Sequence, residues 1–257
     1  MGARLFNIFI LPVSIIILLA ILAVPVIVIY LFLRLTETAF EQVGFNHWHA
    51  SLAVFGSILG SLINIPLNRY PIYTYSDWYI SIASVFVSDF PYYFHPVYLV
   101  INFGGCIIPI MISIHLLITG RASAIKATIG VFVVAIATYV AAEPVPYEGI
   151  VLPFWLSPIL AAICGLVLAW GYAGAPPLAY ISGTIGTLLG ADIFSLLTPG
   201  VLPELSPLGS FTTHPVYLSI GGAGVFDGIF LTGIMAVLLA AAIVCLFQGS
   251  CDGVKTL

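Results

Sequence analysis

Residues 181–234 read ISGTIGTLLGADIFSLLTPGVLPELSPLGSFTTHPVYLSIGGAGVFDGIFLTGI, and this stretch decides the fold prediction. It holds two glycine-rich apolar segments, each with one carboxylate, Asp192 and Asp227, where hydropathy predicts membrane. An ionisable side chain inside a bilayer costs roughly 3 kcal/mol or more, so such a residue indicates a functional site. A short loop rich in Pro, Gly and Ser joins the two segments, which predicts neighbouring antiparallel helices and makes the two acids a candidate facing pair.

The composition excludes a soluble domain. The chain is 61% hydrophobic and 6% charged, with a mean hydropathy of +1.20, whereas a water-facing surface needs about a quarter charged residues. No polar stretch is long enough to fold alone, so residues 1–257 are predicted to form a single integral membrane domain whose partner is the lipid bilayer. The net charge of −4 and the lack of a basic run speak against nucleic acid as a partner.

About 20 apolar residues cross the hydrocarbon core of a bilayer. The sequence therefore predicts an all-α bundle of about seven transmembrane helices, at residues 6–33, 48–68, 96–119, 124–142, 151–173, 177–198 and 215–247. The long connector 69–95 is rich in Tyr, Trp and Phe, which is typical of an aromatic belt at the membrane interface. A short β-hairpin or a re-entrant segment is the alternative for this connector.

Positive charge predicts the orientation, because loops on the cytoplasmic side carry an excess of Lys and Arg. With seven spans, one side carries Arg34, Arg121, Lys126 and Lys255, and the other carries Arg4 and Arg69. We therefore expect a multi-pass protein of the cell membrane with its N-terminus outside and its C-terminus inside.

One internal repeat is visible. The sequence His-Pro-Val-Tyr-Leu occurs at 95–99 and again at 214–218, and a Gly pair follows each copy within a few residues. The flanks also match and predict repeat units of about 48–119 and 177–247, arranged in parallel as in some transporters. This alignment sets Asn64 opposite Asp192 and Ile108 opposite Asp227.

The acid pair admits three interpretations. Two carboxylates that share a proton could hydrolyse a peptide bond, one by activating water and the other by protonating the carbonyl or leaving group. The same acids could bind a translocated ion or proton. Finally, each of Asp192 and Asp227 could serve structure alone, in a non-catalytic subunit of a membrane complex.

Other polar and small residues extend this candidate site. Asn64 and Asn102 lie at a depth comparable to that of the acids, so we expect one shared polar site. Glycines let membrane helices approach closely or leave room for a ligand, and the candidate binding glycines are Gly190, Gly221, Gly222, Gly224 and Gly228.

An isolated His-x-His at 47–49 is weak evidence for a metal, and no cofactor fingerprint is present. We therefore predict neither a metal nor a cofactor.

The stretches INFGGCIIP, GADIFSLL and SIGGAGVFDGIFLTGI resemble a family of prokaryotic multi-spanning membrane proteins known as a domain of unknown function. The resemblance covers most of the chain beyond the first span and implies the architecture of a membrane helix bundle. It implies no particular activity.

A more distant likeness is to the intramembrane aspartyl proteases, the presenilin and signal-peptide-peptidase group. That resemblance implies that Asp192 is the first catalytic acid, that Asp227 is the second, and that substrates are transmembrane helices. The chain departs from the group because Val-Phe precedes Asp227 in place of Gly-x-Gly, and no Pro-Ala-Leu follows. An ion- or proton-coupled transporter or channel that uses the same acids is the alternative, and the oligomeric state is not predicted.

Overall fold

The computed structural model describes residues 2–70, 72–74, 95–145, 149–169, 174–205, 216–222 and 228–248. Within these ranges the helices of 11 residues or more are α1 (Gly2–Val43), α2 (His47–Gly60), α4 (Ile108–Ile118), α5 (Ala124–Ala141), α6 (Leu156–Leu168), α7 (Ala175–Thr187) and α10 (Gly228–Gln248). The shorter helical segments are η1 (Phe103–Ile107), η3 (Leu188–Phe194), α8 (Ser195–Leu197) and α9 (Val201–Leu205). The strands are β1 (Asn64–Pro66), β2 (Ile72–Thr74), β3 (His95–Asn102), β4 (Glu143–Val145), β5 (Gly149–Val151) and β6 (Val216–Ile220).

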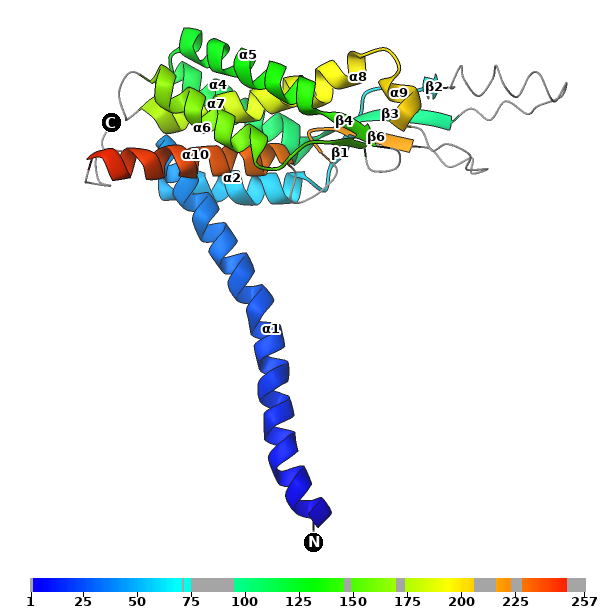
Figure 1. Cartoon of the computed structure of the whole chain (residues 1–257), viewed down its shortest axis with the longest axis vertical. Helices are drawn as coiled ribbons and strands as arrows, with labels where there is room; N and C mark the ends of the chain where they lie inside the picture. Colours follow the sequence, from blue (N-terminus) through cyan, green and yellow to red (C-terminus); the bar gives the residue numbers. More distant parts are fainter. Residues whose placement is uncertain are drawn as a thin grey trace, which may run out of the picture.

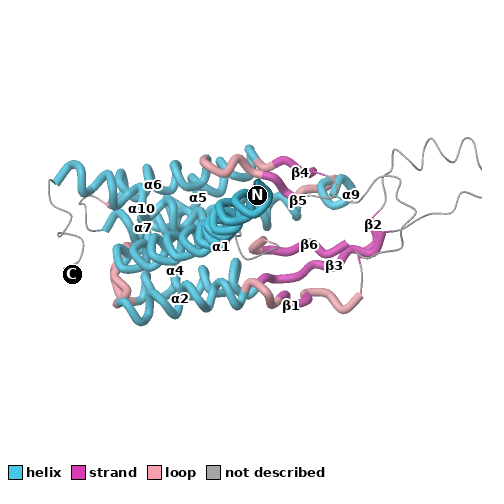
Figure 2. Tube along the Cα trace, turned by 90° about the horizontal axis from the view of Figure 1, so that it is seen from below, coloured by secondary structure: helices cyan, strands magenta, loops and turns pink. Residues whose placement is uncertain are grey.

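The predicted helical membrane bundle is confirmed. In the part of the chain that the structure describes, four helical stretches are long and apolar enough to cross a membrane, namely Ile21–Val43, Ala124–Ala141, Ala175–Leu197 and Gly228–Phe247. Two shorter apolar helices, Phe103–Ile118 and Leu156–Leu168, lie beside them. Figure 2 shows the packed helices at one end and the strands, together with the short helix α9, at the other.

Helix α7 is the centre of the bundle. Every residue of α7 except Ile185 is buried, and the helix packs against α5, α6 and α10. Small residues permit this close packing. A Cβ added at Gly183 would lie 3.0 Å from the Ala161 Cβ on α6, and one at Gly186 would lie 2.7 Å from the Val134 Cβ on α5.

Helix α1 joins this bundle only through its C-terminal part. Phe40 is 1% exposed, and its ring lies 5.8 Å from that of Tyr180 on α7 and 6.3 Å from that of Phe230 on α10. Residues 21–31, by contrast, are all exposed, and α1 runs away from the other helices (Figure 1). An exposed helix that is apolar on all sides is typical of a segment surrounded by lipid.

The larger sheet is built around β3. Strands β1 and β2 pair antiparallel with β3, and β6 pairs parallel with it. The register of the parallel pair sets Tyr98 opposite Tyr217 and Leu99 opposite Leu218, so identical residues of the two His-Pro-Val-Tyr-Leu copies are neighbours. The two tyrosine rings stack at 5.5 Å. Strands β4 and β5 form a separate antiparallel hairpin.

The strands correct three helix boundaries. We predicted helix as far as residue 68, whereas α2 ends at Gly60 and strand β1 follows at Asn64–Pro66. We also predicted helix from residue 96 and from residue 215, whereas the first residues of both segments are strand, at His95–Asn102 and Val216–Ile220. Both segments are rich in β-branched and aromatic residues, which favour strands. Hydropathy cannot distinguish such a run from the start of an apolar helix.

Candidate functional site

A cavity of about 570 Å³ lies where the helical bundle meets the strands. Its walls come from the segment that follows β5, from α6, from α7 and η3, from β6 and from the first turns of α10. Most of the lining is apolar, as with Leu196, Leu218 and Met235, and Asp192 is the one carboxylate among the described lining residues. The cavity has the size of a small-molecule site.

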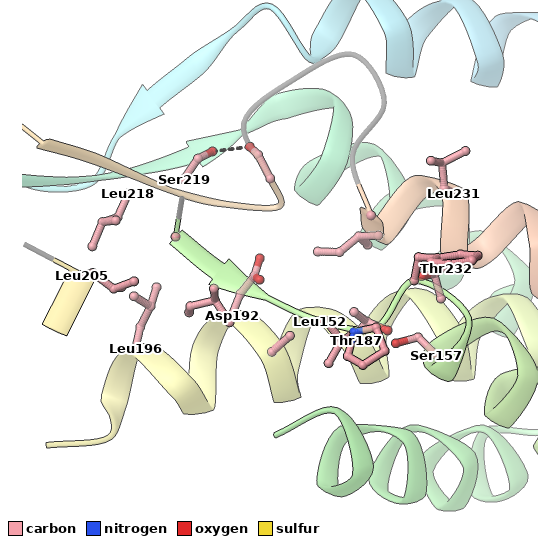
Figure 3. Close-up of a pocket in the computed structure, with 18 of the residues that line it drawn as sticks. Leu152, Ser157, Thr187, Asp192, Leu196, Leu205, Leu218, Ser219, Leu231 and Thr232 are labelled. Atoms are coloured by element: carbon pink, nitrogen blue, oxygen red, sulfur yellow. Dashed lines mark hydrogen bonds between the residues drawn. The ribbon is translucent and has the colours of Figure 1, made fainter. Parts of the chain in front are cut away.

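Asp192 projects from the π-helical segment η3 into this cavity (Figure 3). One carboxylate oxygen, Oδ2, accepts a hydrogen bond of 2.6 Å from the backbone N–H of Gly221, in the turn after β6. Single π-helical turns inside α-helices occur frequently at functional sites. The predicted site residues Asp192 and Gly221 are therefore brought into direct contact.

Gly190 explains the direction in which Asp192 points. A Cβ at Gly190 would lie 2.1 Å from the Thr138 Oγ1 and 2.2 Å from the Ala135 carbonyl oxygen, so this face of η3 is pressed against α5. Two residues further along, a helical side chain lies on roughly the opposite face, because each residue turns about 100°. Asp192 therefore faces away from α5 and toward β6.

Gly221 is required on two grounds. Its φ of +90° lies in the left-handed region, which costs a residue with a side chain roughly 1–2 kcal/mol. A Cβ at this position would also lie 2.6 Å from the Cys106 Cβ in η1. The turn continues through Gly222, with φ +82°, whose carbonyl oxygen accepts the Ser219 hydroxyl. Gly222 and Gly228 both line the cavity, and their role in binding a ligand stays a prediction.

Asp227 and Gly224 lie outside the residues that the structure describes. The facing pair of Asp192 and Asp227 therefore stays a prediction. Gly228, the residue that follows Asp227 in the chain, lines the same cavity as Asp192.

Asn64 and Asn102 contact each other where β1 pairs with β3. Asn102 is 0% exposed; its Nδ2 donates to the Ser61 carbonyl oxygen and to the Asn64 Oδ1, at 2.8 and 3.1 Å. Its Oδ1 accepts from the Gly105 N–H at 2.8 Å and so caps the start of η1. Neither asparagine is among the described residues that line the cavity, so a site shared with Asp192 stays a prediction.

Two cavity residues escaped the sequence reasoning. The hydroxyls of Ser157 and Thr187 are buried and have no hydrogen-bond partner among the described residues, and both residues line the cavity. Serine and threonine are common in membrane helices as packing residues, so nothing in the sequence distinguishes these two.

The histidines near α2 form local contacts. Asn46 caps α2 by accepting from the His49 backbone N–H at 3.0 Å, and His47 Nδ1 lies 3.4 Å from Glu41 Oε1. Within the described ranges, no group of three His, Cys, Asp or Glu side chains is placed to hold a metal ion.

Comparison with known proteins places the chain in a family. No curated protein and no solved structure matches it. Residues 58–239, which include α2 from its last residues, the sheet, the cavity and most of α10, match the model of the family described as Protein of unknown function (DUF1614). Because this match covers well over half of the sequence, the protein belongs to that family.

Proposed function

We propose that the protein binds a small positively charged solute at Asp192 and carries it across the cell membrane. The observation that supports this proposal is a carboxylate facing an apolar cavity where the helical bundle meets the strands. A carboxylate in surroundings of low dielectric needs a counter-charge, and ionisable residues in membrane segments mark pathways of ions and substrates.

Among the described residues Asp192 accepts one hydrogen bond, at Oδ2, which leaves its other oxygen for a ligand. Oδ2 accepts the Gly221 N–H, whereas an ammonium group, with its three N–H donors, can approach the other oxygen. Charge-assisted hydrogen bonds of this kind are roughly twice as strong as neutral ones. Transporters also build substrate sites where a membrane helix is interrupted. Here the apolar segment that contains α10 is interrupted in a similar way, because it begins with strand β6 and becomes helical only a few residues later.

The orientation belongs to the same proposal. The charge bias places the strand end of the bundle, and with it the cavity, toward the outside of the cell, with the N-terminus out and the C-terminus in. The solute would then enter from the outside.

Calorimetric binding of n-hexylammonium to the protein in nanodiscs, with empty nanodiscs subtracted, tests the proposal. Asp192→Asn keeps an acceptor for the Gly221 N–H but removes the charge. A hydrogen bond to a charged group contributes about 1.5–3 kcal/mol, so the affinity should fall by about 10-fold or more. Glu143→Gln, an exposed acid on β4, is the matched control and should bind like the wild type. Equal affinity in wild type and Asp192→Asn would refute a site at this carboxylate.

Transport requires a second measurement. n-Hexylammonium generates a current across a proteoliposome membrane only if the protein carries the cation, because neutral amine that diffuses through the lipid moves no charge. The wild type should give a saturable current that Asp192→Asn lacks. Binding without any current would indicate a membrane receptor for this class of solute and would exclude a transporter.

An intramembrane aspartyl hydrolase is the second candidate. It is favoured by one observation: Gly228, the residue after Asp227, lines the cavity that holds Asp192. In that case Asp192→Asn and Asp227→Asn should each abolish cleavage of a transmembrane test peptide, because one acid activates water while the other donates a proton. Cleavage that persists in either variant would exclude the hydrolase.

A further inference from the structure

Ser157 and Thr187 form a second polar point in the Asp192 cavity. Ser157 is 1% exposed and Thr187 is 4% exposed, and neither hydroxyl has a hydrogen-bond partner in the described part of the chain. Buried hydroxyls are nearly always paired, because an unpaired one loses the hydrogen bonds that water would give it. Five described side chains carry such a hydroxyl, namely Ser57, Ser157, Tyr180, Ser182 and Thr187. Of these, only Ser157 and Thr187 line the cavity, so these two are the ones that a ligand can pair.

The separation of the two polar points follows from the helix that carries them. Thr187 is the last residue of α7, and Asp192 lies five residues later in η3. A π-helical turn brings residues i and i+5 to the same face, and the rise per residue separates them by about 7 Å along the axis. Ser157 comes from the first turn of α6, which packs against α7. Figure 3 shows Ser157 and Thr187 grouped together and apart from Asp192.

The remainder of the lining is mostly apolar, with Ser219 and Thr232 among the further hydroxyl side chains. Leu152, Ile229 and Met235 are among the residues that line it, and apolar walls favour an apolar ligand body by the hydrophobic effect. A ligand that satisfies all three parts of the lining has a cationic end, a hydrocarbon body and a second hydrogen-bonding group about 7 Å from the charge.

We infer that the ligand is an amphipathic amine, whose ammonium group binds Asp192 and whose hydroxyl or carbonyl group binds Ser157 and Thr187. This inference rests on the proposed function and assigns its substrate class. Ser157 and Thr187 determine specificity, because they distinguish an amine with a second polar group from a plain alkylamine.

A matched pair of probes tests the assignment. The compounds 5-amino-1-pentanol and n-hexylamine have the same number of non-hydrogen atoms and differ by one hydroxyl in place of one methyl group. Their affinities are measured by calorimetry on the full chain in phosphatidylcholine nanodiscs. The readout is the ratio of the two dissociation constants, which cancels effects common to both amines.

In the wild type the ratio should favour the amino alcohol. In the double variant Ser157→Ala, Thr187→Val the preference should fall by about 3- to 10-fold, the net value of one or two hydrogen bonds. Thr187→Ser retains a hydroxyl and should retain the preference, which separates pairing with the ligand from a change in packing. Asp192→Asn should weaken both probes alike.

The failures of the two proposals are distinguishable. If hexylamine binds in an Asp192-dependent manner but the double variant leaves the ratio unchanged, the substrate class is wrong and the cation site stands. If hexylamine does not bind through Asp192, the proposed function itself fails. A repeat in nanodiscs with phosphatidylethanolamine identifies the source of the amine: competition by this lipid indicates an amino-lipid headgroup, and unchanged affinity indicates a free amine.

Discussion

The Gly221 N–H and the Asp192 carboxylate join two segments that are distant in sequence, at 2.6 Å. The hydrogen bond requires Gly221 in a left-handed conformation and in close contact with Cys106. Any side chain at residue 221 therefore affects the sheet turn and the carboxylate together. Asp192 is consequently positioned by the backbone of β6 as well as by its own helix.

Gly221→Ala should lower the free energy of unfolding by about 2–5 kcal/mol. About 1–2 kcal/mol of this comes from the left-handed φ and about 1–3 kcal/mol from overpacking against Cys106. Gly200→Ala is the control, since Gly200 has a φ of +95° and nothing lies within 4 Å of an added Cβ. Unfolding by SDS in mixed micelles measures both variants. Equal losses would show that the contact with Cys106 contributes nothing.

Asn102→Ala should be destabilising, whereas Asn64→Ala should change the free energy of unfolding by no more than about 0.5 kcal/mol. Truncation of Asn102 leaves the buried Gly105 N–H and Ser61 carbonyl oxygen without this partner, at about 1–3 kcal/mol for each group. Asn64 is exposed, and its loss leaves the bond from Asn102 to Ser61. The same SDS titration applies, and a large effect of Asn64→Ala would contradict this assignment.

Ser157→Ala and Thr187→Val should leave the stability of the ligand-free protein unchanged or raise it. Their hydroxyls have no partner among the described residues, so removal of the polar group relieves a desolvation cost. Thr138→Val is the contrast, because the Thr138 hydroxyl donates to the Val134 carbonyl oxygen at 2.9 Å. Thermal unfolding in detergent compares the three variants. A loss for Thr187→Val as large as that for Thr138→Val would show that Thr187 is already paired.

Among the elements, the helical stretch formed by α7 and η3 packs against other helices with one face and lines the cavity with the opposite face. The glycine face packs against α5 and α6 through Gly183, Gly186 and Gly190, and the other face presents Asp192 to the cavity. The close approach of η3 to α5 thus fixes the position of the carboxylate.

Gly190→Ala should therefore destabilise the protein by about 1–3 kcal/mol through overpacking and also weaken binding of hexylammonium. The added Cβ would meet the Ala135 carbonyl oxygen of α5, a backbone atom that cannot rotate away. Gly56→Ala in α2 is the matched control, since the nearest atom is the Ile108 Cδ1 at 3.5 Å. That variant should stabilise its helix by about 0.5–1 kcal/mol. Thermal unfolding and calorimetry report the two effects separately.

The sequence predicts the helical elements better than the strands. Hydropathy alone indicates a membrane bundle, because a run of about 20 apolar residues has few other uses. Strands β3 and β6 are short apolar runs that precede helical segments in the sequence, and no periodicity separates the two states there. Pairing between two distant segments, as in the parallel register of Val97 with Val216, is not encoded locally.

The candidate site was predictable in the same uneven way. Asp192 was identifiable because a charge in an apolar span has a high cost, and the glycines near it because they are dense in sequence. Ser157 and Thr187 were not, since their significance comes from having no partner, which only the packed structure reveals. The role of Asn102 as a helix cap depends on the hydrogen bond that its side-chain oxygen accepts from the Gly105 N–H. The sequence does not reveal that bond.

On the scale of the whole molecule, basic residues lie at both ends of the bundle. The connection between α4 and α5, which holds Arg121, lies at the end away from the strands (Figure 2). The strand end carries Arg69 among its described connections.

A single membrane domain over residues 1–257 and a parallel duplication both stay predictions. The in-register pairing of β3 with β6 is the observation that favours the duplication.

Labelling of single cysteines should reveal the orientation. In a background without native cysteines, Pro199→Cys at the strand end should react with a membrane-impermeant maleimide in intact cells. Ser123→Cys, between α4 and α5, should react only after permeabilisation, because positive charge favours the cytoplasmic side. Both positions are exposed. The opposite pattern would invert the orientation and place the cavity toward the cytoplasm.

The parallel pairing of β3 with β6 also means that the sheet is completed late in synthesis of the chain. β3 leaves the ribosome early, but its partner β6 is synthesised only after α4, α5, α6 and α7. Until then one edge of β3 is unpaired, and an open strand edge invites pairing with other chains. The turn that supplies the Gly221 N–H also follows β6. The Asp192 site is thus completed among the last steps of biogenesis, and a chain truncated before β6 would lack both the finished sheet and the site.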